Sequence, residues 1–498
     1  MFALAILAAF LLFSPASPAA PLRAGVARAD ITDREAGPVN DPSFVKALVL
    51  TDGSATAVLV TVDAVALAGI GRIPDSYMAG VRDRLRRELG VAPENVLVNA
   101  SHCHSVVRRD AADLTVQAVK EAWASLVPVK AGAGRGHEDR VMENRRLKLK
   151  DGSEADVRRA YSLPRDGDVA AIGPVDPEIG LVRLDRLDGR PLAAIYHFSM
   201  HPIQGVPGGG NTADITGFAS KVIEDNLGGG AIVFFLQGCA GDINPANYKD
   251  VHAPHDAEPA GNLLGLSALR GLRAIRTAEE ATLRVSNDVI SLPRAADFDR
   301  RITSIRAEQA ELLRSLTGTT LDFKTFLPLY VQYRLSPEFP SSHSHRYAHE
   351  KARGRNDLVR LDEDNRGHLD AYLRNIHTME RLTRLGTNLD LLLKHQAELE
   401  AAGSKTLEVE VGGLRVGDFR LVTFPGELTV EVGLNIKKRS PPLSYVSGYT
   451  NGYIYYTATS AQRNNTGYAQ EDCDVMVAPE WQAVFEEKAV SVLHRLGR

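Results

Sequence analysis

Cysteine is scarce in this chain, and its scarcity excludes a fold held together by disulfides. Three cysteines occur among 498 residues, Cys103, Cys239 and Cys473, so they cannot all pair with one another. The ordinary interpretation is three small, buried, hydrophobic side chains. Cys103 and Cys239 lie inside the polar motifs described below, and the sequence leaves open whether their sulfurs approach each other.

An excess of charge of one sign is also missing. The 58 Lys and Arg residues are interspersed with 62 Asp and Glu residues, which leaves a formal net charge of -4. Domains that bind nucleic acid concentrate basic residues on one face or along one segment. The charge pattern therefore predicts no nucleic-acid partner, while the oligomeric state stays open.

Long hydrophobic runs are absent after the N-terminus. The apolar run Phe2–Phe13 is too short to span a bilayer, and the small-residue segment Ser14–Ala20 follows it. This order is typical of a signal peptide, with cleavage after Ala19 or Ala20. We therefore expect residues 1–20 to be a leader and the mature protein to be exported, periplasmic or secreted, without a transmembrane segment.

The chain does contain alternating strand and helix patterns. Short apolar strands are predicted at 47–50 and 57–63 and a helix at 77–89, and the alternation continues to about residue 285. This pattern predicts an α/β fold of layered sheets flanked by helices. We expect one domain over residues 21–498.

Residues 298–402 differ in character from the rest of the chain. This segment is charged and strongly helical, with apolar residues at helical spacing at Leu369, Leu373, Ile376, Met379, Leu382 and Leu385. Strand patterns resume at Leu407, so the segment is predicted to be a helical insertion. Its histidines His343, His345 and His349 stand among Ser, Pro and Arg residues, which favours an exposed loop over a second metal site.

Two histidines follow the apolar run 95–98, at His102 and His104. A strand that ends in His-x-His points both imidazoles to the same face. Converging neutral imidazoles are typical of a zinc site. The alternative is that one histidine packs in the core and the other meets solvent.

Three other predicted strands also end in polar motifs. The strand at 192–196 leads to His201-Pro202, the strand at 231–236 leads to Gly241–Pro245, and the strand at 420–424 leads to Glu427. Ligands gather beyond the carboxyl ends of strands in open α/β sheets, so these ends are predicted to meet in one site. Histidines plus a glutamate suit zinc, with one position left for water. Each motif alone has an ordinary structural interpretation as a core histidine, a surface carboxylate or a turn.

The ordered set of motifs resembles the neutral, non-lysosomal ceramidase family, from about Ala24 to the C-terminus without the helical insertion. The matching segments are Gly25–Thr32, His102–Ser105, Asn144-Arg145, His201-Pro202, Asp214–Ser220, Gly241–Pro245, Pro425–Glu427 and Asn451–Tyr456. The resemblance implies a ceramidase-like catalytic domain that holds Zn²⁺.

The resemblance also implies roles for individual residues. By the family's pattern His102, His201, Glu427 and Tyr456 would hold the zinc ion, with Tyr453 and Tyr455 as neighbouring alternatives to Tyr456. It implies that His104 lines the site without binding zinc directly, either as a proton carrier or as a group that supports the metal ligands. It further implies that Tyr468 and Arg145 donate hydrogen bonds to the substrate or its oxyanion, which is usually a large electrostatic contribution to acyl transfer.

The family's catalytic serine is missing, because Asn244 stands at its position. Asparagine has no ionisable hydroxyl, so a serine-centred route is closed there. Cys239 is a conceivable substitute nucleophile, although a buried structural cysteine is the usual case. The simpler alternative is direct attack by zinc-bound water, whose pKa zinc lowers to about 7. His104 or Asp242 would then accept the proton, while Asn244 orients water or substrate.

These observations predict an exported zinc-dependent hydrolase that cleaves an amide or related acyl bond. Arg108 and Arg109 replace the family's glycine-rich continuation, which argues for a polar or anionic substrate and against ceramide. The substrate is expected to be a small molecule or a lipid or sugar conjugate. Two alternatives remain: a glycosidase that uses Asp214, Asp242 and Glu427, and a metal-containing binding protein without catalysis.

Overall fold

The computed structural model describes most of the chain. The described residues are 21–157, 164–205, 211–246, 248, 252, 255–338, 343–465, 467 and 469–497. The predicted leader, residues 1–20, and Tyr468 lie outside these ranges.

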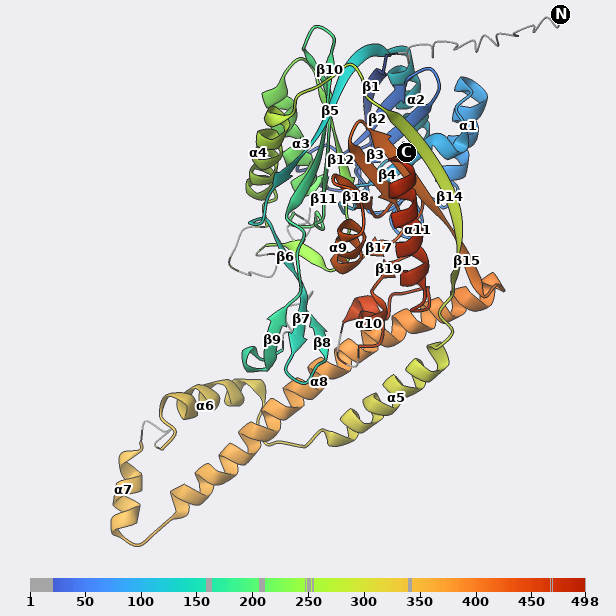
Figure 1. Ribbon diagram of the computed structural model, residues 1–498. Coiled ribbons are helices and arrows are strands. Elements are labelled where there is room, and N and C mark those ends of the chain that lie inside the picture. The colour runs from blue at the N-terminus through green and yellow to red at the C-terminus, as the bar shows by residue number, and fades with distance from the viewer. Residues whose placement is uncertain are drawn as a thin grey trace, which may run out of the picture.

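An eight-stranded mixed sheet forms the centre of the fold, in the order β12-β11-β10-β5-β1-β2-β3-β4 (Figure 1). Neighbours pair antiparallel except β3 with β4 and β11 with β12, which are parallel. The strands are β1 (Arg23–Asp30), β2 (Phe44–Thr51), β3 (Thr56–Val62), β4 (Val96–Ala100), β5 (Val127–His137), β10 (Glu178–Arg186), β11 (Pro191–Phe198) and β12 (Ile232–Gln237).

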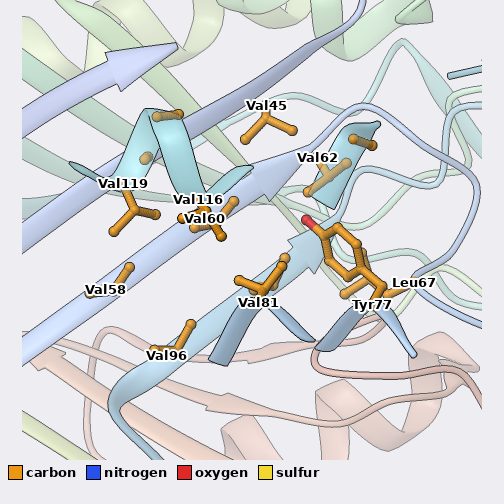
Figure 2. Packing of buried hydrophobic residues seen from close by; sticks show 14 of the residues in the cluster. Val45, Val58, Val60, Val62, Leu67, Tyr77, Val81, Val96, Val116 and Val119 are labelled. Carbon is orange, nitrogen blue, oxygen red and sulfur yellow. The ribbon is translucent and has the colours of Figure 1, made fainter. Parts of the chain in front are cut away.

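Helices cover one face of this sheet. They are α1 (Tyr77–Leu89), α2 (Ala111–Ala124), α3 (Asp214–Leu227) and α4 (Glu258–Ala274). Along β3, Val58, Val60 and Val62 pack with Val81 of α1 and other residues of this core, as Figure 2 shows. Leu59, between them in sequence, belongs to the core on the opposite face. The period-2 alternation of β3 therefore places a different hydrophobic core on each side of the sheet.

A second sheet packs on the opposite face, and helices cover its outer side. Its strands, in the order β14-β15-β16-β18, are β14 (Leu283–Pro293), β15 (Thr406–Val416), β16 (Phe419–Thr423) and β18 (Ser444–Ser447). Leu414 and Leu421 meet Leu59 in the core between the two sheets. The helices α9 (Val430–Lys438) and α11 (Trp481–Arg495) pack on the outer side through residues such as Val432 and Phe485. The result is the predicted α/β fold of layered sheets flanked by helices.

Short elements complete the fold around the strand ends. The pairs are β6 (Met142–Asn144) with β13 (Ile243–Pro245) and β17 (Glu427–Leu428) with β19 (Tyr456–Thr457). A three-stranded sheet holds β7 (Arg146–Leu149), β8 (Glu154–Asp156) and β9 (Val169–Ile172). The remaining short elements are α10 (Ser460–Arg463) and 3₁₀ turns at Pro93–Asn95, Asp166–Asp168 and Gln470–Asp472.

The segment 298–402 is helical and projects from the layers between β14 and β15 (Figure 1). Its helices are α5 (Phe298–Ser315), α6 (Phe323–Leu335), α7 (His345–Ala352) and α8 (Asp357–Ala402). His345 and His349 are exposed on α7, and His343 is exposed just before it. Among the described residues, no helix is both long enough and apolar enough to cross a membrane.

Candidate metal centre

The two histidines and the glutamate from three separate strand ends meet in one buried cluster. Ligand atoms of His102, His201 and Glu427 all lie within 4.8 Å of one another. The Nε2 atoms of His102 and His201 lie 3.5 and 3.3 Å from the same oxygen, Oε2 of Glu427. In the part of the chain that the structure describes, this is the only such group of three or more His, Cys, Asp or Glu side chains.

Backbone carbonyls fix the orientation of both imidazoles. His102 Nδ1 lies 2.6 Å from the Val65 carbonyl oxygen, and His201 Nδ1 lies 3.1 Å from the Ile243 carbonyl oxygen. Because a carbonyl only accepts, each Nδ1 carries the proton and each Nε2 presents a lone pair toward Glu427. Burial also lowers the pKa of His102 to about 4, which keeps its ring neutral. This is the arrangement found in histidines that ligate metals.

The two histidines of the His-x-His motif differ in burial, although their rings lie in edge-on contact. The strand β4 ends at Ala100, so the alternation rule no longer applies at the histidines. His102 adopts a left-handed backbone conformation, with φ of 65°, and its side chain is buried. His104 is exposed, with its ring centroid 5.4 Å from that of His102.

Two tyrosine hydroxyls hold the Glu427 carboxylate. Tyr449 donates to Oε2 at 3.2 Å, and Tyr453 donates to Oε1. Burial by itself raises the pKa of Glu427, but His102, His201 and Tyr453 outweigh it and hold that pKa well below its usual range. Glu427 is therefore an anion. The motif Asn451–Tyr456 contains Tyr453, which was expected only as an alternative metal ligand, while Tyr449, just before the motif, was not indicated by the sequence.

The structure separates the three tyrosines that the sequence could not distinguish. Glu427 and Tyr456 are direct partners in the parallel pairing of β17 with β19, so their side chains leave the same face. The Tyr456 hydroxyl accepts a hydrogen bond from an Arg145 terminal nitrogen at 3.2 Å. Tyr455 instead lies against the helical insertion, 4.0 Å from Lys394 Nζ to its ring centroid. Tyr455 thus lies away from the cluster, whereas Tyr453 contacts Glu427 through its hydroxyl and Tyr456 is the strand partner of Glu427.

Arg145 connects several parts of the site. The residue is 1 % exposed, and its Nε donates to Glu471 at 2.6 Å. The two terminal nitrogens donate to Asn244 Oδ1 at 3.1 Å, to the Gly241 carbonyl and to Tyr456. No signal in the sequence indicated Glu471, which is 326 positions away from Arg145.

Asn244, which replaces the expected serine, is fully buried on β13. Its Oδ1 accepts from Arg145, whereas its Nδ2 has no hydrogen-bond partner among the described residues. Leaving a buried donor unsatisfied costs about 1–3 kcal/mol. A buried, unused amide N–H is thus available for a ligand or water molecule.

The two other candidate carboxylates, Asp242 and Asp214, accept hydrogen bonds from backbone N–H groups. Asp242 accepts from the Val430 N–H at the start of α9 at 2.7 Å and from Asn144 Nδ2 at 3.2 Å. Burial raises the pKa of Asp242 to about 6. Asp214, with φ of 59°, accepts from three backbone N–H groups, those of Gln204, Gly205 and Ile215. Asp214 therefore shapes a turn and helix start, and does not resemble the free carboxylate that a glycosidase requires.

The cysteines are free and buried. Cys239 belongs to the core beneath α9, its Sγ is 3.8 Å from the Val446 carbonyl oxygen, and burial raises the pKa of its thiol. A protonated thiol in an apolar core is a poor nucleophile.

Arg108 pairs with Asp110, and both Arg108 and Arg109 line a surface cavity of about 740 Å³.

Comparison with known proteins identifies the fold. No protein-family model matches the chain, and no curated protein sequence matches it. The structure is similar to that of a ceramidase complexed with C2, with a TM-score of 0.58 and 16% sequence identity over 96% of this chain and 75% of that chain. It is likewise similar to the neutral ceramidase from Pseudomonas aeruginosa, with a TM-score of 0.57 and 17% identity over 96% and 74%. The chain therefore has the ceramidase-like fold that its motifs predicted.

Proposed function

We propose that this chain is a zinc-dependent hydrolase that cleaves an amide or a related acyl bond. The observation that carries the proposal is the convergence of His102 and His201, through Nε2, on one oxygen of the buried carboxylate Glu427. The ceramidase-like fold supports the assignment to hydrolases.

The side chains present suit zinc. The imidazoles of His102 and His201 offer two nitrogen ligands, and the Glu427 carboxylate offers an oxygen ligand. The phenol of Tyr456, on the same face as Glu427, would offer a second oxygen. Carbonyl partners on Nδ1 of both histidines are the outer contacts that orient metal-binding imidazoles. When bound by such ligands, zinc acts as a Lewis acid that polarises a carbonyl and activates water.

The chain's own residues position the reacting groups. Asn244 would use its unpartnered Nδ2 to donate to the substrate carbonyl or to the attacking water. Arg145 would fix both Asn244 and Tyr456 through its two terminal nitrogens, and so acts mainly as a positioning residue. On the basis of the family resemblance, we also propose that Tyr468 donates a hydrogen bond to the oxyanion.

Two side chains are candidates to accept the proton from water. His104 is exposed beside His102 and able to exchange protons with solvent. Asp242 is fully buried and already accepts two hydrogen bonds, although its pKa is raised to about 6. We favour His104 as the proton carrier. Asp242 would instead connect the start of α9 to the loop before Asn244.

The substrate we propose is a polar or anionic N-acyl compound. The replacement of the serine by Asn244 removes the family's own nucleophile position. Arg108 and Arg109 line an open cavity whose polar rim does not suit a long lipid chain. The predicted leader supports export of the protein.

The test is metal analysis combined with a substrate screen. Purified protein should contain about one zinc per chain, and His102→Ala should lose it while His137→Ala, at an exposed histidine, retains it. N-acyl amines, N-acyl amino acids, acetamido sugars and glycosides are then screened before and after chelation. Zinc-dependent turnover of an N-acyl compound is the expected result. Turnover of glycosides alone would overturn the proposal, and so would the absence of zinc. No turnover with zinc fully bound would indicate a binding protein.

A further inference from the structure

We propose that a cavity between the helical insertion and the body of the protein binds a small anion through its phosphate or carboxylate group. The cavity has a volume of about 300 Å³ and lies between α5, α8 and the segment that follows α10. Figure 1 shows α10 beside α8 where the insertion joins the layers. None of His102, His201 and Glu427 lines the cavity, and the proposal does not depend on the function proposed for the metal centre.

Four guanidinium groups line the cavity, and the carboxylates around it leave one of them uncompensated. The four are Arg300, Arg301, Arg381 and Arg463, and the lining carboxylates are Asp297, Glu308 and Asp472. Asp297 is shared by Arg300 at 3.0 Å and Arg463 at 2.8 Å. Glu308 pairs with Arg381 at 2.8 Å.

The third carboxylate does not neutralise the remaining arginine. Asp472 is paired with Arg146 at 2.9 Å. Arg301 donates to the backbone carbonyl of Asp472 at 2.8 Å and to Cys473 Sγ at 3.2 Å. Among the described residues no carboxylate pairs with Arg301. The cavity therefore has an excess of positive charge, which favours an anion.

Two buried side chains in the wall have polar atoms that lack partners. Arg463 is 4 % exposed, and its Nε has no hydrogen-bond partner among the described residues. Asn388 is 6 % exposed, and its Oδ1 likewise has none. Buried polar groups are normally satisfied, so two such atoms around one cavity indicate a missing polar ligand. The group required would accept from Arg463 and Arg301 and donate to Asn388.

The shape and chemistry of the cavity fit a small ligand. Its volume lies at the lower end of the range for small-molecule sites. Guanidinium groups match the geometry of phosphate and carboxylate oxygens, to which they donate pairs of hydrogen bonds. A hydroxyl or protonated oxygen on the same ligand would serve the Asn388 acceptor.

The proposal is tested by titrating the intact protein calorimetrically with sodium phosphate and, separately, with sodium acetate, at constant ionic strength in sodium chloride. We expect saturable binding of at least one of these anions. Arg301→Gln should weaken that binding at least tenfold. Ser304→Glu, at an exposed position on the cavity wall, should do the same by adding a negative charge.

The matched control is Arg306→Gln, which removes the same charge from an exposed position on α5 outside the cavity lining. Its affinity should equal that of the unmodified protein. Phosphate binding alone would assign the site to phosphate groups, and binding of both anions would extend it to carboxylates. The absence of saturable binding with either anion would overturn the proposal. Unchanged affinity in both Arg301→Gln and folded Ser304→Glu would overturn it as well.

Discussion

The Asn99 side chain joins two strands that lie at opposite edges of the large sheet. Its Oδ1 accepts a hydrogen bond from the Gln237 backbone N–H at 2.9 Å, although β4 and β12 are the two outermost strands. Its Nδ2 lies within hydrogen-bond distance of Ser447 Oγ, the Gly448 carbonyl and Thr450 Oγ1. The sheet therefore curls until its edges approach, and the strand ends that precede His102 and Asp242 come together.

Replacing Asn99 should destabilise the protein and weaken the metal centre. Asn99→Ala leaves the Gln237 N–H buried without its acceptor and removes the Nδ2 donor that the 447–450 loop shares. We expect a loss of about 2–3 kcal/mol in the free energy of unfolding, measured by urea denaturation. Asn95→Ala, at a partly buried position just before β4, should cost much less. Equal effects of the two substitutions would contradict the bridging role of Asn99.

Glu471 should be essential for the position of Arg145. Its carboxylate contacts Arg145 Nε at 2.6 Å and Arg146 at 3.8 Å, and all three side chains are buried. Glu471→Gln keeps the shape but removes the charge, and breaking a buried ion pair costs about 3–5 kcal/mol. We expect a correspondingly lower free energy of unfolding by chemical denaturation.

A functional readout separates positioning by Glu471 from simple stability. If Arg145 positions Asn244 and Tyr456, kcat of Glu471→Gln should fall under conditions where the variant is fully folded. The control is Glu480→Gln, at an exposed carboxylate before α11. Normal kcat in folded Glu471→Gln would argue against this role.

Asp41 should give a pH dependence of known sign. Burial raises its pKa from 3.8 to about 6, against the hydrogen bonds from Thr212 and Ala213. Between about pH 4 and 6 the folded protein keeps a proton that the unfolded chain releases, so the stability contributed by Asp41 falls as pH rises. The stability of the unmodified protein relative to Asp41→Asn should therefore decrease by about 2–3 kcal/mol across this range.

The stability contributed by Asp52 should change with pH in the opposite direction. The backbone and side-chain hydrogen bonds from Ala55 and Ser54 outweigh burial and lower the pKa of Asp52. The stability of the unmodified protein relative to Asp52→Asn should therefore be lost as pH falls through the lowered pKa. Denaturation series from about pH 2 to 7.5 on the three proteins measure both slopes. Parallel curves for Asp41→Asn and the unmodified protein would refute the first prediction.

Zinc should stabilise the folded chain in proportion to its affinity. A ligand that binds only the folded state at one hundred times its Kd adds about 2.7 kcal/mol to the free energy of unfolding. Chelator-treated protein should show a Tm that rises as zinc is returned in a thermal-shift titration. The rise should disappear in His201→Ala and persist in His137→Ala. An equal rise in the two variants would mean that zinc binds elsewhere.

Much of the fold was predictable because local periodicity reports burial directly. The helix expected at 77–89 is α1, and the strand expected at 57–63 is β3 apart from its ends. In both, the spacing of apolar residues is set by the face that packs against the core. The strand-end motifs, and the meeting of His102, His201 and Glu427, could likewise be inferred from the chain order and the family resemblance.

The sequence by itself determined which segments form strands and helices, and which strand ends carry the candidate metal ligands His102, His201 and Glu427. Only the tertiary structure decided that His102 is buried and His104 exposed, because both lie beyond β4, where strand alternation no longer governs side-chain direction. It also placed Tyr455 against the helical insertion and brought Glu471 to Arg145. Repeats of 2 and 3.6 residues specify the faces of single elements, whereas distances between remote elements depend on how the sheet curls and how the layers stack.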